Sequence, residues 1–332
     1  MIIVSRCPYR ISLLGGGSDL DWFVEENDYG ISLGYSLSKY SYTVINKVPF
    51  NTKRGVLNYS TREEYVNIQE IAHPLFKAAL TELEIYDLLE ISSFGFASRG
   101  SGLGGSSSFL ISLLKGLSLI KNNEIEFDEL ANLASEIEIN KIKKPIGRQD
   151  HFISASGKIS CFKYLNDNKK VIRKNLSLAK EKFLRKTIDN LYLVPSFVAR
   201  SADKVLHHLK DLDTTNKKLL EIRKIAEKFI NLEEDRDYKL EEVFNSCVKE
   251  SWEIKKHMSG VMTGILNDQY NVLIKLPLNW IRLLGAGSGG YFLISSKLTH
   301  IETNKKFKDL GIKEFFKASI SESGVEIVHS HE

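Results

Sequence analysis

A glycine- and serine-rich segment at residues 100–108, followed at once by an apolar stretch, constrains this chain more than any other feature. The stretch has leucines at helical spacing, namely Leu110, Leu113, Leu114 and Leu117. A helix N-terminus carries unpaired N–H groups and about half a positive charge, and glycines let the backbone approach an anion closely. The segment therefore predicts a phosphate-binding loop, whose serines add hydroxyl donors or a magnesium ligand. A flexible turn with serine caps is the structural alternative.

The same loop also satisfies the dinucleotide pattern GxGxxG at Gly100, Gly102 and Gly105. That pattern is weak alone, and its βαβ context is poor here. A second match at residues 285–290 runs into a strand, where a dinucleotide site requires a helix. The Walker A pattern is absent from the sequence. An NAD-dependent oxidoreductase therefore stays as an alternative from a different functional class.

Composition excludes several other classes of partner. The chain has 332 residues, enough for two domains, and a net charge of +4, too weak by itself to indicate a nucleic-acid surface. No apolar run is long enough for a membrane span. Cys7, Cys161 and Cys247 lie far apart, which argues against disulfides and zinc and suits a reducing cytosol. We expect a cytoplasmic enzyme or binding protein with no nucleic-acid and no membrane partner.

Strand and helix patterns mix in both halves, so the expected class is α+β. We expect strands over 2–14 and 40–48, an extended segment over 88–97, and helices over 71–84, 200–230 and 240–258. A helix capped by Asp128 should end before Pro145, and a glycine turn at 285–290 should lead into a strand over 291–295. The turn at 166–168 places the domain boundary, giving domains 1–165 and 166–332.

A second polar signal follows the first strand. The strand delivers Arg10, and the glycine turn 15–17 then presents Ser18 and Asp19. An arginine can neutralise a phosphoryl group in transfer, and an aspartate can accept hydrogen bonds from sugar hydroxyls. A surface arginine beside an Asx-type turn is the alternative.

The third signal is a pair of carboxylates around a Pro/Gly turn. On a helix, Glu138 falls at the shoulder of the apolar stripe, where a half-buried metal ligand would sit, whereas Glu136 points to solvent. Asp150 follows the turn at 145–147 and precedes an apolar pair, which suits a partly buried carboxylate held by a loop. A helix N-cap is the alternative for Asp150.

Together these segments and the turn 285–290 resemble the GHMP kinase superfamily, in order and spacing, over about residues 4–295. Within this superfamily, the sequences of the motifs are most similar to those of the bacterial D-glycero-D-manno-heptose 7-phosphate kinases. The strings that carry the likeness are 10–12 with 15–19, 100–104, 145–150, 200–202 and 250–256. The resemblance implies an N-terminal domain like ribosomal protein S5 domain 2 and a ferredoxin-like C-terminal domain.

The resemblance also implies roles for individual residues. The loop would bind the ATP phosphates, Ser106 and Glu138 would bind Mg²⁺, Asp150 would accept the proton of the substrate hydroxyl, and Arg10 would lie at the transferring phosphate. The implied ATP-phosphate residues are Gly100, Ser101, Gly102, Leu103, Gly104, Gly105, Ser106 and Ser107. The implied substrate residues are Gly17, Ser18, Asp19, Arg148 and Gly287.

The implied activity is ATP-dependent phosphorylation of a sugar or sugar phosphate, by a monomer or homodimer. The similarity of the motifs favours the anomeric hydroxyl of D-glycero-D-manno-heptose 7-phosphate as the group that is phosphorylated. This reaction would serve the synthesis of nucleotide sugars for surface polysaccharides. A fucokinase-like or galactokinase-like enzyme is the alternative, and a non-catalytic sugar-binding homologue is a further one. If the substrate already carries a phosphate, Lys144, Arg148 and Arg200 are candidates to receive it.

The sequence differs at four positions from the residues that are usual in the superfamily's motifs. Gly105 replaces a serine, so one hydroxyl donor is lost, and Arg99 replaces a proline before the loop, where it could contact a phosphate. Tyr9 replaces a smaller residue, and Ser288 replaces a glycine in the turn 285–290, the third glycine turn of the chain. These changes leave the ATP site intact in outline and bear on the identity of the sugar.

Overall fold

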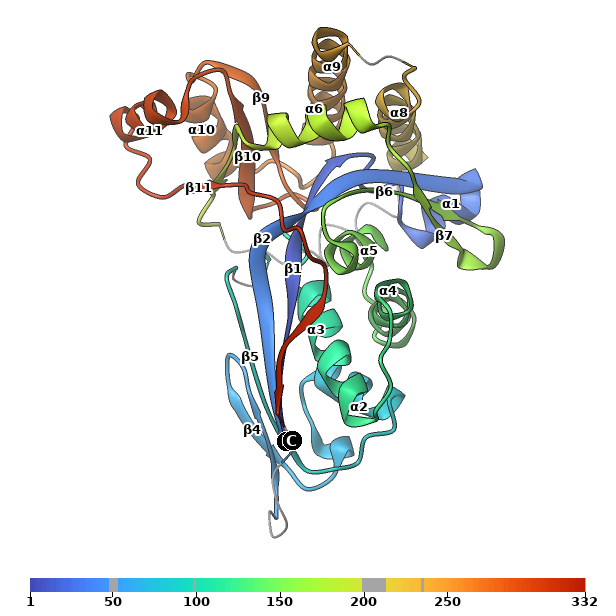
Figure 1. The fold of residues 1–332 in the computed structure, drawn as a ribbon. Helices are drawn as coiled ribbons and strands as arrows, with labels where there is room; N and C mark the ends of the chain where they lie inside the picture. The colour runs from blue at the N-terminus through green and yellow to red at the C-terminus, as the bar shows by residue number, and fades with distance from the viewer. Residues whose placement is uncertain (48–52, 98–99, 199–212, 234–235, 332) are drawn as a thin grey trace.

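The computed structural model describes residues 1–47, 53–97, 100–198, 213–233 and 236–331. In this part of the chain two sheets, each with its own helices, give the expected α+β class (Figure 1). None of the described helices combines the length and the apolarity that crossing a bilayer demands.

The first sheet is built around two long antiparallel strands, β1 (Ile2–Leu14) and β2 (Tyr29–Lys47). Its main path runs β12-β1-β2-β5-β3-β4, and β6 extends it by pairing with the first half of β2. The other strands are β3 (Gly55–Asn58), β4 (Arg62–Tyr65), β5 (Leu89–Gly95), β6 (Ile159–Leu165), β7 (Val171–Lys174) and β12 (Glu326–His331).

Along β1, burial alternates as far as Arg6 and is then continuous from Cys7 to Leu14. Alternation is typical of a strand with one solvated face, and continuous burial of a strand covered on both faces. The second half of β1 is covered on both sides because the second domain packs there, against α8 and α9. Polar side chains in that half, Arg10 and Ser12, are therefore buried at the junction of the domains.

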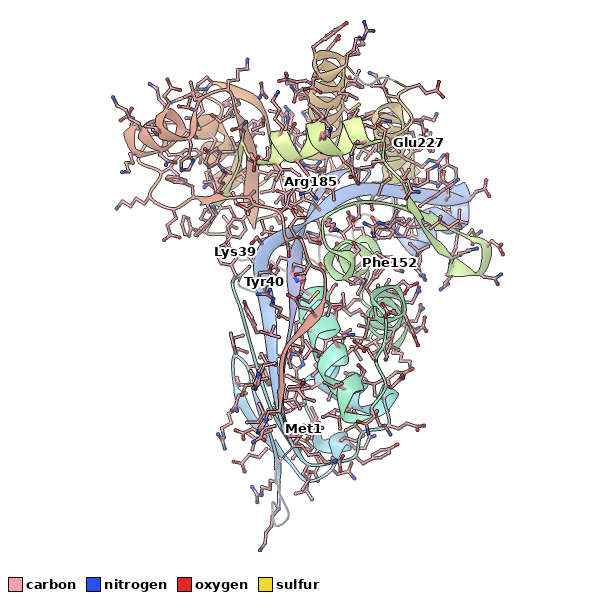
Figure 2. The ribbon with its side chains drawn as sticks, in the orientation of Figure 1. Met1, Lys39, Tyr40, Phe152, Arg185 and Glu227 are labelled. Atoms are coloured by element: carbon pink, nitrogen blue, oxygen red, sulfur yellow. The ribbon has the colours of Figure 1, made fainter. Side chains whose placement is uncertain are left out.

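Helices cover one face of the first sheet (Figure 1). These are α2 (Pro74–Glu82), α3 (Gly105–Ile120), α4 (Phe127–Ser135) and α5 (Gln149–Ser156). The helix α3 lies against β1 and β2 and is flanked by the other three, so all four of its predicted core leucines are fully buried. Figure 2 labels Phe152, by which α5 packs onto Phe162 of β6. Shorter helical elements are α1 (Asp21–Asn27) and the 3-10 turns Ile68–Glu70 and Asp167–Lys169.

The second sheet has the order β11-β8-β10-β9. Its strands are β8 (Leu191–Pro195), β9 (Leu278–Leu283), β10 (Tyr291–Ser296) and β11 (Phe316–Lys317). Its helices are α6 (Leu178–Ile188), α8 (Asp213–Ile230), α9 (Asp237–Lys256), α10 (Gly264–Leu273) and α11 (His300–Asp309). Tyr29, the first residue of β2, joins the two domains by donating a 2.6 Å hydrogen bond to Glu227 of α8. Figure 2 labels Glu227 near the start of β2.

The chain crosses between the sheets twice. The strand β7 pairs with β6 in the first sheet, so the turn at 166–168 lies inside a hairpin of that sheet. The chain then builds the second domain, and β12 returns to pair with β1. Both termini consequently lie at the far end of the first domain (Figure 1). A division at residue 166 separates β7 and β12 from the sheet to which they belong.

The predicted elements are present, with shifts at their ends. The strand over 2–14 and the one after the turn 285–290 are confirmed, and β2 begins eleven residues before the predicted start, since 40 − 29 = 11. The prediction that Asp128 caps its helix is wrong: Glu126 is the N-cap, and Asp128 lies in the first turn, where its charge also suits the helix dipole. Residues 200–212 of the predicted helix over 200–230 lie outside the described residues.

The aromatic core beneath α9 generates a stability prediction. Phe244 is fully buried, with ring centroids 5.0 Å from Phe229 and 5.6 Å from Phe183. Phe244→Ala should lower the free energy of unfolding by about 3–5 kcal/mol, because the lost contacts leave a cavity. Urea unfolding followed by circular dichroism measures it. Tyr238→Ala, at an exposed site on the same helix, should change it by about 0.5 kcal/mol or less; equal losses would contradict the core role of Phe244.

Candidate active site

The glycine loop takes a conformation that few other residues allow. Gly100, Gly102 and Gly104 all have positive φ, at 80°, 77° and 73°. These alternate residues therefore need glycine, and successive amides in such a path can form a concave anion site. The helix α3 starts at Gly105, directly after the loop. The expected arrangement, a glycine loop opening into a helix N-terminus, is present.

A buried carboxylate stands beside this helix start. Glu138 has no exposed surface. Its Oε1 accepts hydrogen bonds from Ser106 Oγ (2.8 Å) and Lys144 Nζ (2.6 Å). Its Oε2 accepts from Ser107 Oγ (2.7 Å) and pairs with His151 Nε2 (2.8 Å). Burial would raise the pKa of Glu138, but the hydrogen bond from His151 and the charge of Lys144 outweigh burial, and the pKa lies well below its usual value.

The sequence pattern underestimated how deeply Glu138 is buried, because the local helix is not an α-helix. Residues Glu136–Lys141 form a π-helical turn that continues α4. Ile142 N donates to Ile137 O at 2.9 Å, which is a π-type bond. The wider turn brings Glu138 fully inward, whereas Glu136 is exposed as expected. The prediction placed Glu138 at the shoulder of the apolar stripe because it assumed the 3.6 residues per turn of an α-helix.

The donor set at Glu138 fits a magnesium ion. Mg²⁺ prefers oxygen ligands and is commonly held by one or two carboxylates together with phosphate oxygens. Ser106 and Glu138 present a hydroxyl and an ionised carboxylate 2.8 Å apart, and Ser106 borders the cleft. No group of three or more acidic, histidine or cysteine side chains suited to a metal occurs among the described residues. A metal here would therefore take its remaining ligands from phosphate and water.

Arg10 and Asp150 form the charged pair at the base of the loop. Asp150 Oδ1 accepts both Arg10 Nε (2.7 Å) and Arg10 Nη2 (2.6 Å). Arg10 Nη1 donates to the Gly102 carbonyl at 2.6 Å, so the arginine also ties this pair to the glycine loop. Asp150 Oδ2 makes no hydrogen bond to the described residues, and Asp150 borders the cleft. That oxygen can accept a proton from a bound hydroxyl group.

Asp150 lies in the first turn of α5 and not in a loop. The N-cap of this helix is Arg148, so the N-cap alternative for Asp150 is also wrong. Its side chain is 21% exposed, which agrees with the expected partial burial. The first turn of a helix is a position where a negatively charged side chain suits the helix dipole.

Asp19 is held rigidly at the other side of the cleft. It accepts hydrogen bonds from Gly17 N (3.0 Å), Gln149 N (2.9 Å) and Gln149 Nε2 (2.8 Å). Burial raises the pKa of Asp19, and the backbone bond from Gln149 only partly offsets this. A Cβ at Gly147 would lie 2.0 Å from Asp19 Oδ2, so glycine is needed for this approach. Asp19 and Gly17 both border the cleft, as the sequence suggested.

A cleft of about 1000 Å³ is bordered by Ser106, Arg10, Asp150 and Asp19, whereas Glu138 does not border it and is fully buried. The first domain lines it with the glycine loop, the turn 15–17 and α5, and the second domain lines it with α8, α9 and β9. The turn after β9 closes one wall, through Gly285 and Ala286. At Gly290 a Cβ would lie 2.4 Å from the Ser101 carbonyl, so the third glycine turn packs directly on the loop. Position 288, where serine replaces the usual glycine, has φ 59°.

Several predicted site residues do not border the cleft. Ser18 is fully buried and bonds to the carbonyls of Gly15 and Ile31, so it stabilises the turn. Arg148 pairs with Asp21 on another face at 2.9 Å. Gly287 packs against Val261 behind the turn. Leu103 is buried beneath the loop, and the side chain of Ser107 faces Glu138. Arg99, Arg200 and residues 201–202 lie outside the described residues.

Three residues of the site were not found from the sequence, of which Gln149 and Arg282 border the cleft and His151 is fully buried. His151 completes the shell of Glu138, Gln149 fixes Asp19, and Arg282 projects from β9. The segment 280–284 did contain a signal for Arg282, because one arginine interrupts an otherwise apolar run. For His151 and Gln149 no local pattern separates a site residue from a core or capping residue. Lys144 borders the cleft, but it is paired with Glu138.

Comparison with known families and curated proteins identifies related chains. Residues 71–158 match the family described as GHMP kinases N terminal domain. A curated D-glycero-alpha-D-manno-heptose 7-phosphate kinase of Campylobacter jejuni is 24% identical over 306 residues, covering 87% of this chain and 88% of the relative.

Solved structures share the fold over the full length of the chain. A D-glycero-D-manno-heptose 1-phosphate kinase from Bacteroides thetaiotaomicron has a TM-score of 0.73 at 17% identity, with 100% of both chains covered. Lactococcus lactis galactokinase complexed with galactose has a TM-score of 0.72 at 15% identity, covering 98% of this chain and 95% of that one. At such identities the likeness concerns the fold. Residues 71–158 therefore carry a GHMP kinases N terminal domain, and the chain as a whole shares its two-domain fold with these kinases.

Proposed function

We propose that this protein is an ATP-dependent sugar kinase that phosphorylates a hydroxyl group of a sugar phosphate. The observation that carries the proposal is the Asp150–Arg10 pair. One oxygen of Asp150 is occupied by Arg10, and the other is open to a cleft that also contains the start of α3. A base for the hydroxyl, a cation for the phosphoryl group and an anion-binding helix start are thus adjacent.

The nucleotide would lie along the first domain. Its phosphates would meet the glycine loop and the first turn of α3, where N–H groups and the helix dipole favour negative charge. Beyond the loop the cleft is bordered by aromatic side chains, with Tyr59 and His73 centroids 4.7 Å apart and Phe109 near His73 at 5.8 Å. Aromatic side chains suit the flat face of a nucleobase.

In the transfer step the acceptor hydroxyl oxygen attacks the γ-phosphorus, and the bond from that phosphorus to ADP breaks. The hydroxyl proton passes to Asp150 Oδ2, and ADP leaves with the bonding electron pair. Arg10 offsets charge on the moving group while it holds Asp150 in position. Alignment and charge stabilisation contribute most of the rate enhancement in such reactions.

Glu138 and Ser106 would hold the magnesium ion that accompanies ATP. When bound, the ion neutralises charge on the phosphate oxygens. His151 and Lys144 keep the Glu138 carboxylate ionised and oriented, since each places a positive or hydrogen-bonding group against it.

For the acceptor we propose D-glycero-D-manno-heptose 7-phosphate, phosphorylated at its anomeric hydroxyl, as a step toward a nucleotide sugar for surface polysaccharides. The curated relative carries that substrate in its name and aligns over most of the chain. Asp19, fixed by three hydrogen bonds, can accept further bonds from sugar hydroxyls.

The test of this assignment is a screen with Mg-ATP. Heptose 7-phosphate, galactose, fucose and mevalonate are offered separately, ADP release is measured, and the product is read by phosphorus NMR. We expect a new anomeric phosphate signal with heptose 7-phosphate. Turnover of galactose or fucose alone would shift the assignment to those kinases. Absence of ADP release with every sugar of an extended panel would indicate a non-catalytic homologue.

The role of Asp150 predicts a large kinetic effect. Asp150→Asn should lower kcat by about 10²–10⁴, because the hydroxyl proton loses its acceptor. Binding of the Mg complex of a nonhydrolysable ATP analogue, measured by calorimetry, should change little. Asp21→Asn is the control, since Asp21 pairs with Arg148 away from the cleft. Near wild-type turnover in Asp150→Asn would remove this residue from the mechanism.

The role of Glu138 predicts an altered magnesium requirement. Glu138→Gln keeps the shape but removes the negative charge, so the Mg²⁺ concentration for half-maximal activity should rise by about tenfold or more. A magnesium titration at fixed ATP measures this effect. Glu136→Gln, on the same π-helical turn but exposed, should leave the titration unchanged. The same shift in both variants would contradict a metal role for Glu138.

A further inference from the structure

Arg282 is a buried arginine at the wall of the cleft. It lies in β9, is 4% exposed, and borders the cleft between apolar neighbours of its strand. Its Nη1 donates to the carbonyl of Leu13 in β1, so it reaches across from the second domain to the first. Its Nε is buried and has no partner among the described residues, and it forms no ion pair with them.

A guanidinium in this position is costly without an anion. Burial of an unpaired charge is unfavourable unless hydrogen bonds or a counterion compensate it. The nearby Arg10 is already neutralised by Asp150, whereas Arg282 adds a second positive charge beside it. Burial and the charge of Arg10 lower the pKa of Arg282 to about 10, which leaves the guanidinium protonated at neutral pH.

Two further buried polar atoms without partners belong to residues that border the same cleft. Ser12 Oγ is buried and makes no hydrogen bond to the described residues, and neither does Gln149 Oε1. Both face Gly16, where a Cβ would lie 2.7 Å from Ser12 Oγ and 3.4 Å from Gln149 Oε1. Ser12 adjoins Leu13, whose carbonyl Arg282 binds. A side chain at Gly16 would fill this recess.

The chemistry of the three groups defines the ligand. Arg282 can only donate, Gln149 Oε1 can only accept, and the Ser12 hydroxyl can do either. A ligand that carries both anionic oxygens and hydroxyl groups satisfies all three. Arginine is suited to phosphate because its planar fork can form two parallel bonds.

We propose that Arg282 binds a phosphate group in the filled cleft, with Ser12 donating a second hydrogen bond to the same ligand. This inference rests on the proposed kinase function and adds a residue from the second domain to the binding site. The phosphate has two possible sources, the terminal phosphoryl group of the nucleotide and the phosphate of the acceptor. Either source would join β9 to β1 through the ligand.

The experiment compares Arg282→Gln and Arg282→Lys with the wild type. Dissociation constants are measured by calorimetry for the Mg complex of β,γ-imido ATP, for heptose 7-phosphate and for the unphosphorylated heptose. We expect Arg282→Gln to weaken one phosphate-bearing ligand by about tenfold or more, since a bond to a charged group is lost. Weaker binding of the nucleotide analogue would show that Arg282 binds the terminal phosphoryl group of the nucleotide. Weaker binding of heptose 7-phosphate, with unchanged binding of the unphosphorylated heptose, would show that Arg282 binds the phosphate of the acceptor.

Arg223 provides the matched control. It also joins the domains through backbone carbonyls, of Asn27 (2.9 Å) and Tyr29 (2.8 Å), but it does not border the cleft. Arg223→Gln should leave all three dissociation constants within about twofold. Changes of less than about twofold in Arg282→Gln, or equal changes in Arg223→Gln, would overturn the inference.

Two further measurements separate the inference from folding and from the proposed function. If Arg282→Gln does not fold, Arg282→Lys decides, because lysine keeps the charge but loses the planar fork; binding within about twofold of wild type would then refute the inference. If the wild type transfers no phosphate to any sugar, the proposed function fails by itself. Inorganic phosphate, followed by its NMR line width, then tests whether binding still depends on Arg282.

Discussion

The buried carboxylate of Glu138 is the interaction on which the site depends. It draws together the start of α3, the π-helical turn and α5, through hydrogen bonds with Ser106, Ser107, Lys144 and His151. A fully buried charge is stable only when its partners are in place, and removal of one partner from such a pair typically costs about 3–5 kcal/mol. The same bonds therefore fix the backbone that presents the glycine loop and Asp150.

The second domain completes what the first domain begins. Arg10, in β1, links Asp150 to the glycine loop within the first domain. Arg282 of the second domain binds the carbonyl of Leu13, which also lies in β1. The third glycine turn packs on the loop at Gly290, so the loop is bounded by both domains. A cleft walled in this way can hold the two substrates in line and exclude water, which is how alignment and charge stabilisation act in phosphoryl transfer.

Much of the first domain follows from local patterns. The glycine loop, the leucines of α3 and the strand before the turn 15–17 were all predicted, because periodic burial and glycine chemistry act over a few residues. The misplaced details have physical causes. Asp128 is not the cap because Glu126 takes the N-cap position one residue before α4. The depth of Glu138 depends on a π-helical turn, which period 3.6 does not reveal.

The sequence alone was enough to predict the GHMP kinase N-terminal domain and to single out the glycine loop, Arg10 and Asp150 as site candidates, since each is carried by a short motif. Only the tertiary structure decided which polar residues meet in the cleft. In the tertiary structure Arg148 pairs with Asp21 and Ser18 is buried in the core. Arg282, far from β1 in sequence, binds a carbonyl of that strand. The physical reason is that burial and pairing of a charge depend on contacts between segments far apart in sequence, which no local spacing encodes.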